Sequence, residues 1–159
     1  SMAPSQLGLF AKSSPKVETP DLQWHVQPLS LDSWEKPLHP WPGLTASVCA
    51  LRPTSRGSVK LTSPDTRDPP TIDPRYLTTA EDRRVAAAAL RMTRTIAAQL
   101  DASLEASEYV PGADCESDEA LADAAGKIGT SIFHPTGTTR MGPDGDPSAV
   151  LDSKLRVRD

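Results

Sequence analysis

The fold class is decided by the stretch LTASVCAL, residues 44–51. Apolar side chains recur there at every second position, as in a strand that buries one face. A similar alternation marks residues 22–26 before it and residues 58–62 after it. Because the connection 52–57 contains Pro and Gly, we expect strands 44–51 and 58–62 to pair as an antiparallel hairpin with a longer loop.

A long helix is predicted to begin after Thr79. The Thr79 hydroxyl can accept a hydrogen bond from the amide of Asp82, and acidic residues suit the positive N-terminal end of a helix. The apolar residues that follow lie on one stripe as far as Leu100, which is the pattern of a helix packed on a sheet. Ser117 marks the start of a second predicted helix.

The remaining segments complete the order of elements. We interpret residues 1–20 as a loose entry with at most one helical turn, and residues 63–77 as an extended surface crossing. Residues 130–134 alternate like a strand, which Pro135 ends. The order strand, hairpin, helix, helix and strand predicts an α+β fold in which helices back an antiparallel sheet.

Length and charge exclude several classes of protein. The 159 residues suit one domain. The chain has 17 basic and 21 acidic residues, a net charge of −4, which argues against nucleic-acid binding and against an electrostatic membrane anchor. No apolar stretch approaches the roughly 20 residues that cross a bilayer, so we expect no transmembrane segment. Cys49 and Cys115 form neither a CxxC pair nor a disulfide framework.

Three histidines are the candidates for acid–base chemistry. His39 stands in a Pro-rich loop, where we expect a solvated surface role. His25 stands on the polar face of strand 22–26. His134 ends the predicted strand 130–134, where an imidazole could meet a substrate. The residues alone leave both a structural and a functional role open for His25 and for His134.

Neither a metal site nor a nucleotide site is predicted. His134 has no metal-ligating neighbour at zinc spacing. The run Asp144-Gly145-Asp146 lacks the later ligands of a calcium loop. No GxGxxG motif occurs, so we do not expect this chain to bind a dinucleotide in the usual way.

Two stretches resemble segments of one enzyme family. The first is RPTSRGSVKL, residues 52–61, with its continuation to Leu77. The second is HPTGTTRMG, residues 134–142, with its continuation through 151–157. In order and spacing both are similar to segments of the glucose–methanol–choline (GMC) oxidoreductases, and the resemblance extends over essentially the whole chain. It looks most like the bacterial branch of choline dehydrogenases and alcohol dehydrogenases.

The resemblance implies an activity and two site residues. Members of the family bind FAD on a nucleotide domain and oxidise a small alcohol by hydride transfer to the flavin, and their substrate domain is an antiparallel sheet backed by helices. His134 matches the histidine that takes the hydroxyl proton, which makes it the predicted catalytic residue. His25 aligns with a segment that lines the substrate pocket, so we predict a substrate-binding role for it.

The resemblance also implies parts that are absent from this sequence. The flavin-binding motif of the family lies upstream, and the partner of the catalytic histidine, a His or Asn, lies downstream. We therefore expect residues 1–159 to form an incomplete substrate-binding domain without its FAD-binding domain. We expect the isolated chain neither to hold FAD nor to oxidise alcohols.

Two other interpretations remain open. The chain could be a non-catalytic binding module, or one subunit of a split flavoenzyme whose nucleotide half is a separate chain. The face that meets a nucleotide domain would be bare in isolation, and large bare apolar patches promote association, so we expect a homodimer through that face. We expect a cytoplasmic location.

Overall fold

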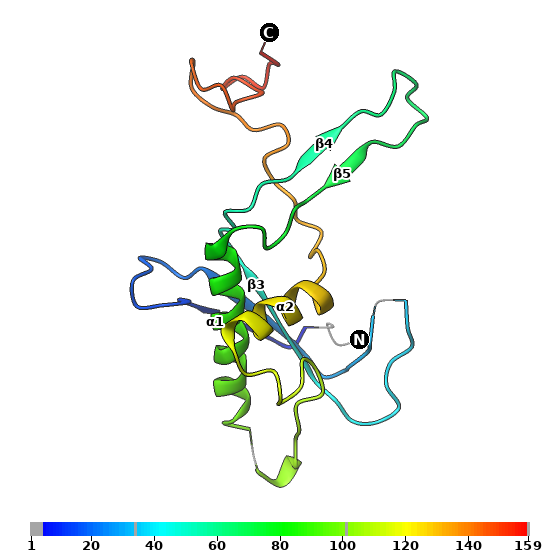
Figure 1. Cartoon of the computed structure of the whole chain (residues 1–159), viewed down its shortest axis with the longest axis vertical. Helices are drawn as coiled ribbons and strands as arrows, with labels where there is room; N and C mark the ends of the chain where they lie inside the picture. Colours follow the sequence, from blue (N-terminus) through cyan, green and yellow to red (C-terminus); the bar gives the residue numbers. More distant parts are fainter. Residues whose placement is uncertain (1–4, 34, 101, 159) are drawn as a thin grey trace. The chain divides into compact units, whose positions relative to one another are not determined.

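A computed structural model describes residues 5–33, 35–100 and 102–158 (Figure 1). It contains two antiparallel sheets and two α-helices, which confirms the predicted α+β class. The elements in chain order are β1 (Leu7–Ala11), β2 (Leu22–Gln27), β3 (Thr45–Ala50), β4 (Ser58–Lys60), β5 (Thr71–Asp73), α1 (Ala80–Ala97), the short 3-10 helix η1 (Ala102–Leu104) and α2 (Asp118–Ile128).

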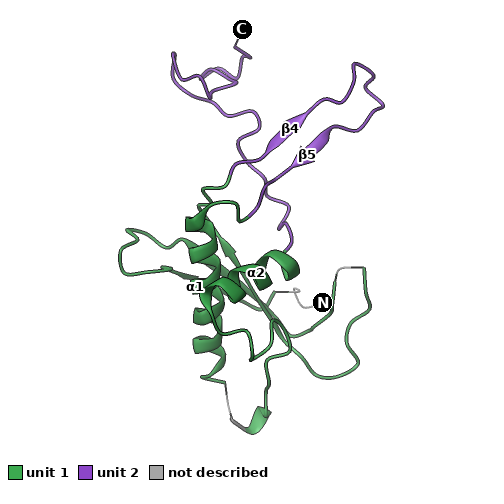
Figure 2. Cartoon of the chain, in the orientation of Figure 1, with its two compact units in different colours: residues 1–55, 77–129 green, residues 56–76, 130–159 purple. Residues whose placement is uncertain are grey.

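The chain divides into two compact units (Figure 2). The first unit comprises residues 1–55 and 77–129, and the second comprises residues 56–76 and 130–159. The first unit holds the three-stranded sheet and both α-helices, whereas the second holds the two-stranded ribbon and the C-terminal segment.

The sheet of the first unit has the order β1-β2-β3, with all neighbours antiparallel. The strands predicted at 22–26 and 44–51 are confirmed as β2 and β3. The loose entry predicted for residues 1–20 is wrong at residues 7–11, which form β1 along the edge of β2, whereas residues 1–4 lie outside the described part of the chain. The local signal for β1 is weak, because its glycine is depleted in strands and its apolar residues do not keep a strict alternation, so β2 is needed as a pairing partner.

The predicted hairpin of strands 44–51 and 58–62 is also wrong. β3 pairs with β2, and β4 pairs with β5, in which Val59 lies opposite Ile72. The backbone amides of Thr54 and Ser55 donate to the carboxylate of Asp82, so the stretch after β3 is held at the start of α1 and does not turn back along the strand before β4 begins. β5 occupies part of the stretch 63–77 that was predicted to be a crossing.

The prediction of helix α1 is confirmed at its start. The amide of Asp82 donates to Thr79 Oγ1 at 3.2 Å, the expected capping bond. Val85 and Ala89 of α1 are buried against Leu22 and Trp24 of β2, and this is the core of the unit. The predicted helix is longer than the observed one. α1 ends at Ala97, so Leu100, the last residue of the predicted apolar stripe, lies outside the helix.

Helix α2 begins after Ser117, whose hydroxyl accepts from the amide of Ala120 at 3.1 Å, so this prediction is also confirmed. α2 packs against α1 and buries Leu121 completely. Three arginines of α1 make ion pairs with the segment that contains α2 and with the residues before it: Arg83 with Asp123, Arg91 with Asp118, and Arg94 with Glu108.

The strand predicted at 130–134 does not form. Phe133 has a φ of 63°, which takes the backbone out of the extended region. Its amide donates to Ser131 Oγ at 2.9 Å, and such local side-chain bonds compete with strand pairing. His134 therefore stands in an irregular segment, and its expected place at the end of a strand is wrong. Among the described residues no helix has the length and apolarity to cross a membrane.

Candidate active site

The two predicted site residues lie in different units, so each is described with its own surroundings. His134 is exposed, and its imidazole has no hydrogen-bond partner among the residues that the structure describes. Phe133 before it has a left-handed backbone, and Gly137 after it has a φ of 97°. Non-glycine residues in this region cost of order 1–3 kcal/mol and cluster at functional sites. The imidazole therefore lies exposed in an irregular segment, with an unusual backbone conformation close to it on both sides.

A cluster of three Arg–Asp ion pairs follows His134 within residues 140–158. We call this hydrogen-bonded cluster the knot. Arg140 pairs with Asp146 at 2.9 Å and also donates to Ser148. The backbone carbonyl of Arg140 accepts from the amides of Val150 and Leu151. Hydrogen bonds from Ser148, together with the guanidinium of Arg140, lower the pKa of Asp146 to about 2. Asp146 is thus an anionic anchor of the turn.

The second pair of the knot joins its two ends. Arg158 donates to Asp144 at 2.9 Å and to the carbonyl of Gly142 at 2.7 Å. Asp144 and Asp146, the pair considered above as a calcium loop, are therefore both engaged by guanidinium groups. Among the described residues no group of three His, Cys, Asp or Glu side chains could hold a metal ion.

The third pair of the knot closes its last turn. Asp152 accepts from the amides of Lys154 and Arg156 and from Arg156 Nε. The amide and guanidinium of Arg156 lower the pKa of Asp152. Three Arg–Asp pairs thus hold together the turns of residues 140–158, which follow His134 in the sequence.

His25 lies on β2, with Gly8 of β1 and Ser47 of β3 directly opposite. Its side chain points to the face away from Trp24, as the alternation along the strand predicts. Helix α1 covers the Trp24 face. His25 is half-buried and makes no side-chain hydrogen bond within the described residues.

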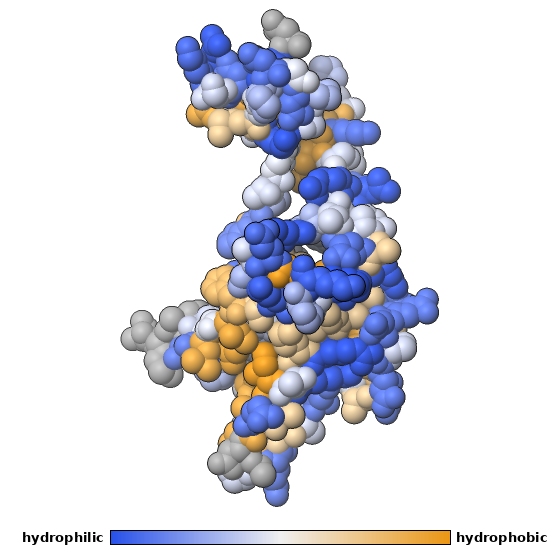
Figure 3. Space-filling model, turned by 90° about the vertical axis from the view of Figure 1, so that its left-hand side faces the viewer, coloured by the Kyte–Doolittle hydropathy of each residue, from blue (hydrophilic) through white to orange (hydrophobic). Residues whose placement is uncertain are grey.

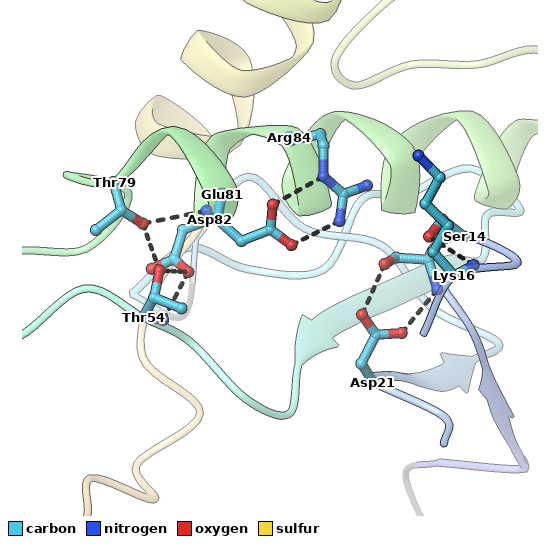
Figure 4. Close-up of polar contacts among 9 residues, drawn as sticks. Ser14, Lys16, Asp21, Thr54, Thr79, Glu81, Asp82 and Arg84 are labelled. Carbon is cyan, nitrogen blue, oxygen red and sulfur yellow. Dashed lines mark hydrogen bonds and ion pairs between the residues drawn. The ribbon is translucent and has the colours of Figure 1, made fainter. Parts of the chain in front are cut away.

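Asp82 fixes the stretch that follows β3, as Figure 4 shows. It is 5% exposed. Its carboxylate accepts from the amides of Thr54 and Ser55 at 2.7 and 2.8 Å, and from the Thr54 hydroxyl at 2.9 Å. Burial raises the pKa of Asp82, but the hydrogen bonds from Ser55 and Thr54 outweigh burial and lower it to about 2.

A small hollow of about 180 Å³ lies beside Asp82. Asp21, which shares its lining, accepts from the amide and hydroxyl of Ser13. Glu81, also in the lining, pairs with Arg84. The carboxylates around the hollow are therefore all engaged by the protein itself, which makes this a structural cluster.

His39 is not solvated, so the surface role expected for it is wrong. Its side chain is 9% exposed. Nδ1 lies 3.0 Å from Ser30 Oγ, and Nε2 lies 3.1 Å from Asp32 Oδ1. The ring stacks on Trp41 with a centroid distance of 4.4 Å and meets the edge of Tyr109. Because both ring nitrogens have hydrogen-bond partners, His39 links the two ends of its loop, and neither nitrogen is available to act as a base.

Sequence reasoning did not identify Asp82, Arg140 or Arg158 as site-forming residues. The partners of Asp82 lie 27 and 28 positions away, a separation at which no local pattern signals contact. The pair of Asp152 and Arg156 has a detectable signal, because opposite charges four positions apart favour contact in a tight turn or helix.

Comparison with known protein families assigns this chain to a family. A family model described as GMC oxidoreductase matches residues 53–159, which include the Thr54–Asp82 contact and the knot after His134. The chain belongs to the GMC oxidoreductase family.

Similar GMC proteins support the assignment. Choline oxidase of Arthrobacter globiformis is 38% identical over 162 residues, covering 96% of this chain and 29% of the relative. The alcohol dehydrogenase (acceptor) of Pseudomonas putida is 39% identical over 159 residues, covering 97% of this chain and 28% of the relative. This GMC chain thus spans about three tenths of the length of the curated relatives it matches.

Solved structures agree with the sequence relatives. Pyridoxine 4-oxidase from Mesorbium loti shares 29% identity with a TM-score of 0.81, over 97% of this chain and 30% of that chain. A fungal aryl-alcohol oxidase shares 27% identity with a TM-score of 0.65, over 88% of this chain and 22% of that chain. This GMC chain therefore has the fold of about a fifth to three tenths of each of these two oxidases.

The described residues do not fit the nucleotide part of a flavin. Dinucleotide sites use a glycine-rich turn between a strand and a helix. Here α1 follows Leu77-Thr78-Thr79, and α2 follows residues 114–117, which contain no glycine. The lining of the hollow beside Asp82 contains three carboxylates together with Arg52, and it contains no glycine, so it does not form a backbone cradle for a pyrophosphate.

Proposed function

We propose that this chain is the substrate-binding and catalytic-histidine part of an FAD-dependent alcohol oxidoreductase. The observation that carries the proposal is His134: an exposed, unbonded imidazole that heads the HPTGTTRMG segment within the family match. Relatives named choline oxidase and alcohol dehydrogenase support alcohols as the substrate class. The substrate is a small alcohol.

His134 acts as the proton acceptor for the substrate hydroxyl. Imidazole suits this task because it can accept a proton and later return one near neutral pH. Its exposure leaves both ring nitrogens accessible. Phe133, the residue before it, has a left-handed backbone conformation, which prevents this segment from pairing as a β-strand. His25 contributes to substrate binding from β2.

The cofactor of the reaction is FAD, which supplies the hydride acceptor when bound. The described residues offer no cradle for it, so a separate FAD-binding part of the protein holds it. The isolated chain therefore binds no FAD and has no turnover of its own. A purified chain that carried stoichiometric yellow flavin would contradict this.

The test of the function uses the complete reading frame that contains this chain. In that protein His134→Ala should lower the rate of flavin reduction by an alcohol by at least about a hundredfold, the usual contribution of a general base. The flavin absorbance should stay unchanged, since His134 is proposed to act on the substrate. Unchanged flavin reduction in the variant would rule out the assigned role.

The same experiment separates two further possibilities. If the reading frame ends with this chain and a flavoprotein co-purifies with it, the chain is one subunit of a split enzyme. If neither a flavin nor a flavoprotein partner accompanies it, and no alcohol is oxidised, the chain is a binding module and the proposed activity is wrong.

We also propose that the isolated chain forms a homodimer. Large apolar side chains are exposed, among them Leu7 and Leu9 on the edge strand β1, and Figure 3 shows apolar patches on one face of the molecule. Exposed patches of this kind favour association. Light scattering at rising concentration tests this, and a monomer at high concentration would contradict it.

A further inference from the structure

A long irregular connection joins β2 to β3 in the first unit. β2 ends at Gln27 and β3 begins at Thr45, and residues 28–33 and 35–44, the part of the connection that the structure describes, form no helix or strand. Connections longer than about 12–15 residues without secondary structure are uncommon in compact domains, and many of them are functional loops such as lids. We call residues 28–44 the strap.

His39 closes the strap on itself. Its backbone amide donates to the carbonyl of Ser30 at 2.9 Å, and Nδ1 lies 3.0 Å from Ser30 Oγ. Nε2 lies 3.1 Å from Asp32 Oδ1. The side chain of His39 is largely buried, whereas the nearby Leu38 and Trp41 are more than half exposed. The imidazole is therefore shielded inside a loop whose other side chains face solvent.

Tyr109 meets the strap from outside it. This residue lies between η1 and α2, and its hydroxyl donates to Asp32 Oδ1 at 3.3 Å, across 77 positions of sequence. Its ring meets the edge of His39 at a centroid distance of 5.3 Å and that of Trp41 at 6.2 Å. One carboxylate oxygen of Asp32 thus binds both the imidazole inside the strap and the phenol outside it.

The segment that carries Tyr109 is tied to helix α1. Glu108 pairs with Arg94 of α1 at 2.8 Å, and the guanidinium of Arg94 also donates to the carbonyls of Gly112 and Cys115. Charge-assisted bonds of this kind are the strong ones. Tyr109 therefore has a fixed position on the first unit, against which the strap can rest.

The contact between strap and Tyr109 is weaker than the ties on either side of it. Asp32 and Tyr109 are both exposed, so water competes for their hydrogen bond. Segments with few buried apolar contacts and solvent-exposed hydrogen bonds open locally at a lower free energy than the core does. Opening of the strap separates Asp32 from Tyr109, removes the phenol ring from His39 and brings the imidazole into solvent.

We propose that residues 28–44 open and close as one unit, that Asp32 holds the strap closed on Tyr109, and that His39 is shielded from solvent in the closed state alone. The inference goes beyond the proposed function and does not depend on it, because every group in it belongs to the first unit and none has a role in the oxidation of an alcohol.

Modification of histidine by diethyl pyrocarbonate, read by peptide mass spectrometry, measures the opening of the strap in the 159-residue chain. The reagent transfers an ethoxycarbonyl group to an imidazole nitrogen that has a free electron pair, and ethyl carbonate leaves. Both nitrogens of His39 are engaged in the closed state. We expect His39 to react at least about tenfold more slowly than the exposed His134, and equal rates would contradict a closed state.

Tyr109→Phe removes the hydroxyl that binds Asp32 and keeps the ring. We expect the rate at His39 to rise at least about fivefold, the effect of losing one hydrogen bond, while the rates at His25 and His134 stay within about twofold. Tyr76→Phe, at an exposed position of the second unit, is the matched control and should leave all three rates unchanged. An unchanged rate at His39 in Tyr109→Phe, or an equal rise at all three histidines, would overturn the proposal.

Asp32→Ala tests the residue that holds the strap. It removes the acceptor of both His39 and Tyr109, so Tyr109→Phe should add less than about twofold to the His39 rate in that background. If Tyr109→Phe has the same effect with and without Asp32, the phenol acts elsewhere and Asp32 does not hold the strap.

Hydrogen exchange decides whether the strap opens as one unit. The amides of Lys36 and His39 donate to the carbonyls of Ser33 and Ser30 within the strap. In Tyr109→Phe we expect both amides to exchange faster by the same factor, at least about fivefold. Faster exchange at one amide without the other would show local fraying and would overturn the proposal of a single opening unit.

Discussion

The indole Nε1 of Trp24 donates a hydrogen bond to Thr93 Oγ1 at 2.7 Å, and this bond joins the central strand of the first sheet to helix α1. Trp24 is 1% exposed. The Thr93 hydroxyl in turn donates to the carbonyl of Ala89 at 2.9 Å. The largest buried side chain therefore has its one polar group satisfied by a residue of α1 that lies 69 positions away in the sequence.

Removal of this hydroxyl should destabilise the first unit. Thr93→Val keeps the shape of the side chain but leaves the buried indole N–H without a partner, which costs about 1–3 kcal/mol. Thr93→Ser retains the hydroxyl and is the matched control, with a loss of about 1 kcal/mol at most from the missing methyl group. Urea unfolding followed by Trp fluorescence measures both variants. Equal midpoints for Val and Ser would contradict the role of the bond.

A second prediction concerns Asp82, whose carboxylate holds Thr54 and Ser55. Asp82→Asn replaces one accepting oxygen with an amide group that cannot accept from the backbone, and hydrogen bonds to charged groups are worth about 1.5–3 kcal/mol. We expect a loss of about 2 kcal/mol in the free energy of unfolding at pH 7. Glu81→Gln, at the neighbouring exposed position, removes only a surface pair with Arg84 and should cost less than about 0.5 kcal/mol. Similar losses of unfolding free energy in both variants would contradict the stabilising role of the Asp82 hydrogen bonds to Thr54 and Ser55.

The same carboxylate predicts a dependence on pH. The pKa of Asp82 is lowered from 3.8 to about 2 in the folded chain. A lowered pKa means that the folded state binds the proton less well than the unfolded state does, so the stabilisation is complete above pH 4 and is lost as the pH falls towards 2. We therefore expect the stability difference between wild type and Asp82→Asn to shrink between pH 4 and pH 2. A difference that stays constant over this range, in parallel urea titrations, would show that Asp82 is not the titrating group.

Local signals in the sequence located both α-helices and the strands β2, β3 and β4, but they missed β1 and β5, predicted a strand at 130–134 that does not form, and did not predict strand pairing. Thr79 and Ser117 marked both helix starts correctly, because a cap depends on residues three positions away. The alternation in β2 and β3 located both strands. The partner of β3 was missed, because a strand's alternation fixes its faces without naming its neighbour. β4 and β5 are three-residue strands joined by residues 61–70, and strands this short carry too little alternation to indicate that they pair.

The candidate site was predictable to a similar extent. The resemblance pointed to His134 and His25, and their catalytic and binding roles stay predictions, of which the His134→Ala experiment above tests the first. The surroundings of His134 were not predictable, because Ser131 captures the amide of Phe133 in place of a strand partner. The knot that follows was equally hidden, since Arg140 and Asp146 are polar residues in a glycine- and proline-rich segment where many pairings were open.

The final prediction concerns the packing of this knot at Gly142. A Cβ built at Gly142 would lie 2.6 Å from the Cβ of Ala149 and 3.0 Å from Oδ2 of Asp146, and neither can move without disturbing the pair of Asp146 with Arg140. We expect Gly142→Ala to destabilise the segment 140–158 by about 1–3 kcal/mol, the usual cost of overpacking. Gly8→Ala is the matched control, because its nearest atom would be Trp24 O at 3.8 Å, an ordinary contact. Hydrogen exchange resolved by residue measures the effect: amides of Val150 and Leu151, which bond to the Arg140 carbonyl, should exchange at least about fivefold faster in Gly142→Ala, since about 1 kcal/mol is a factor of five. Unchanged exchange at these two amides would mean that the knot is looser than its hydrogen bonds indicate.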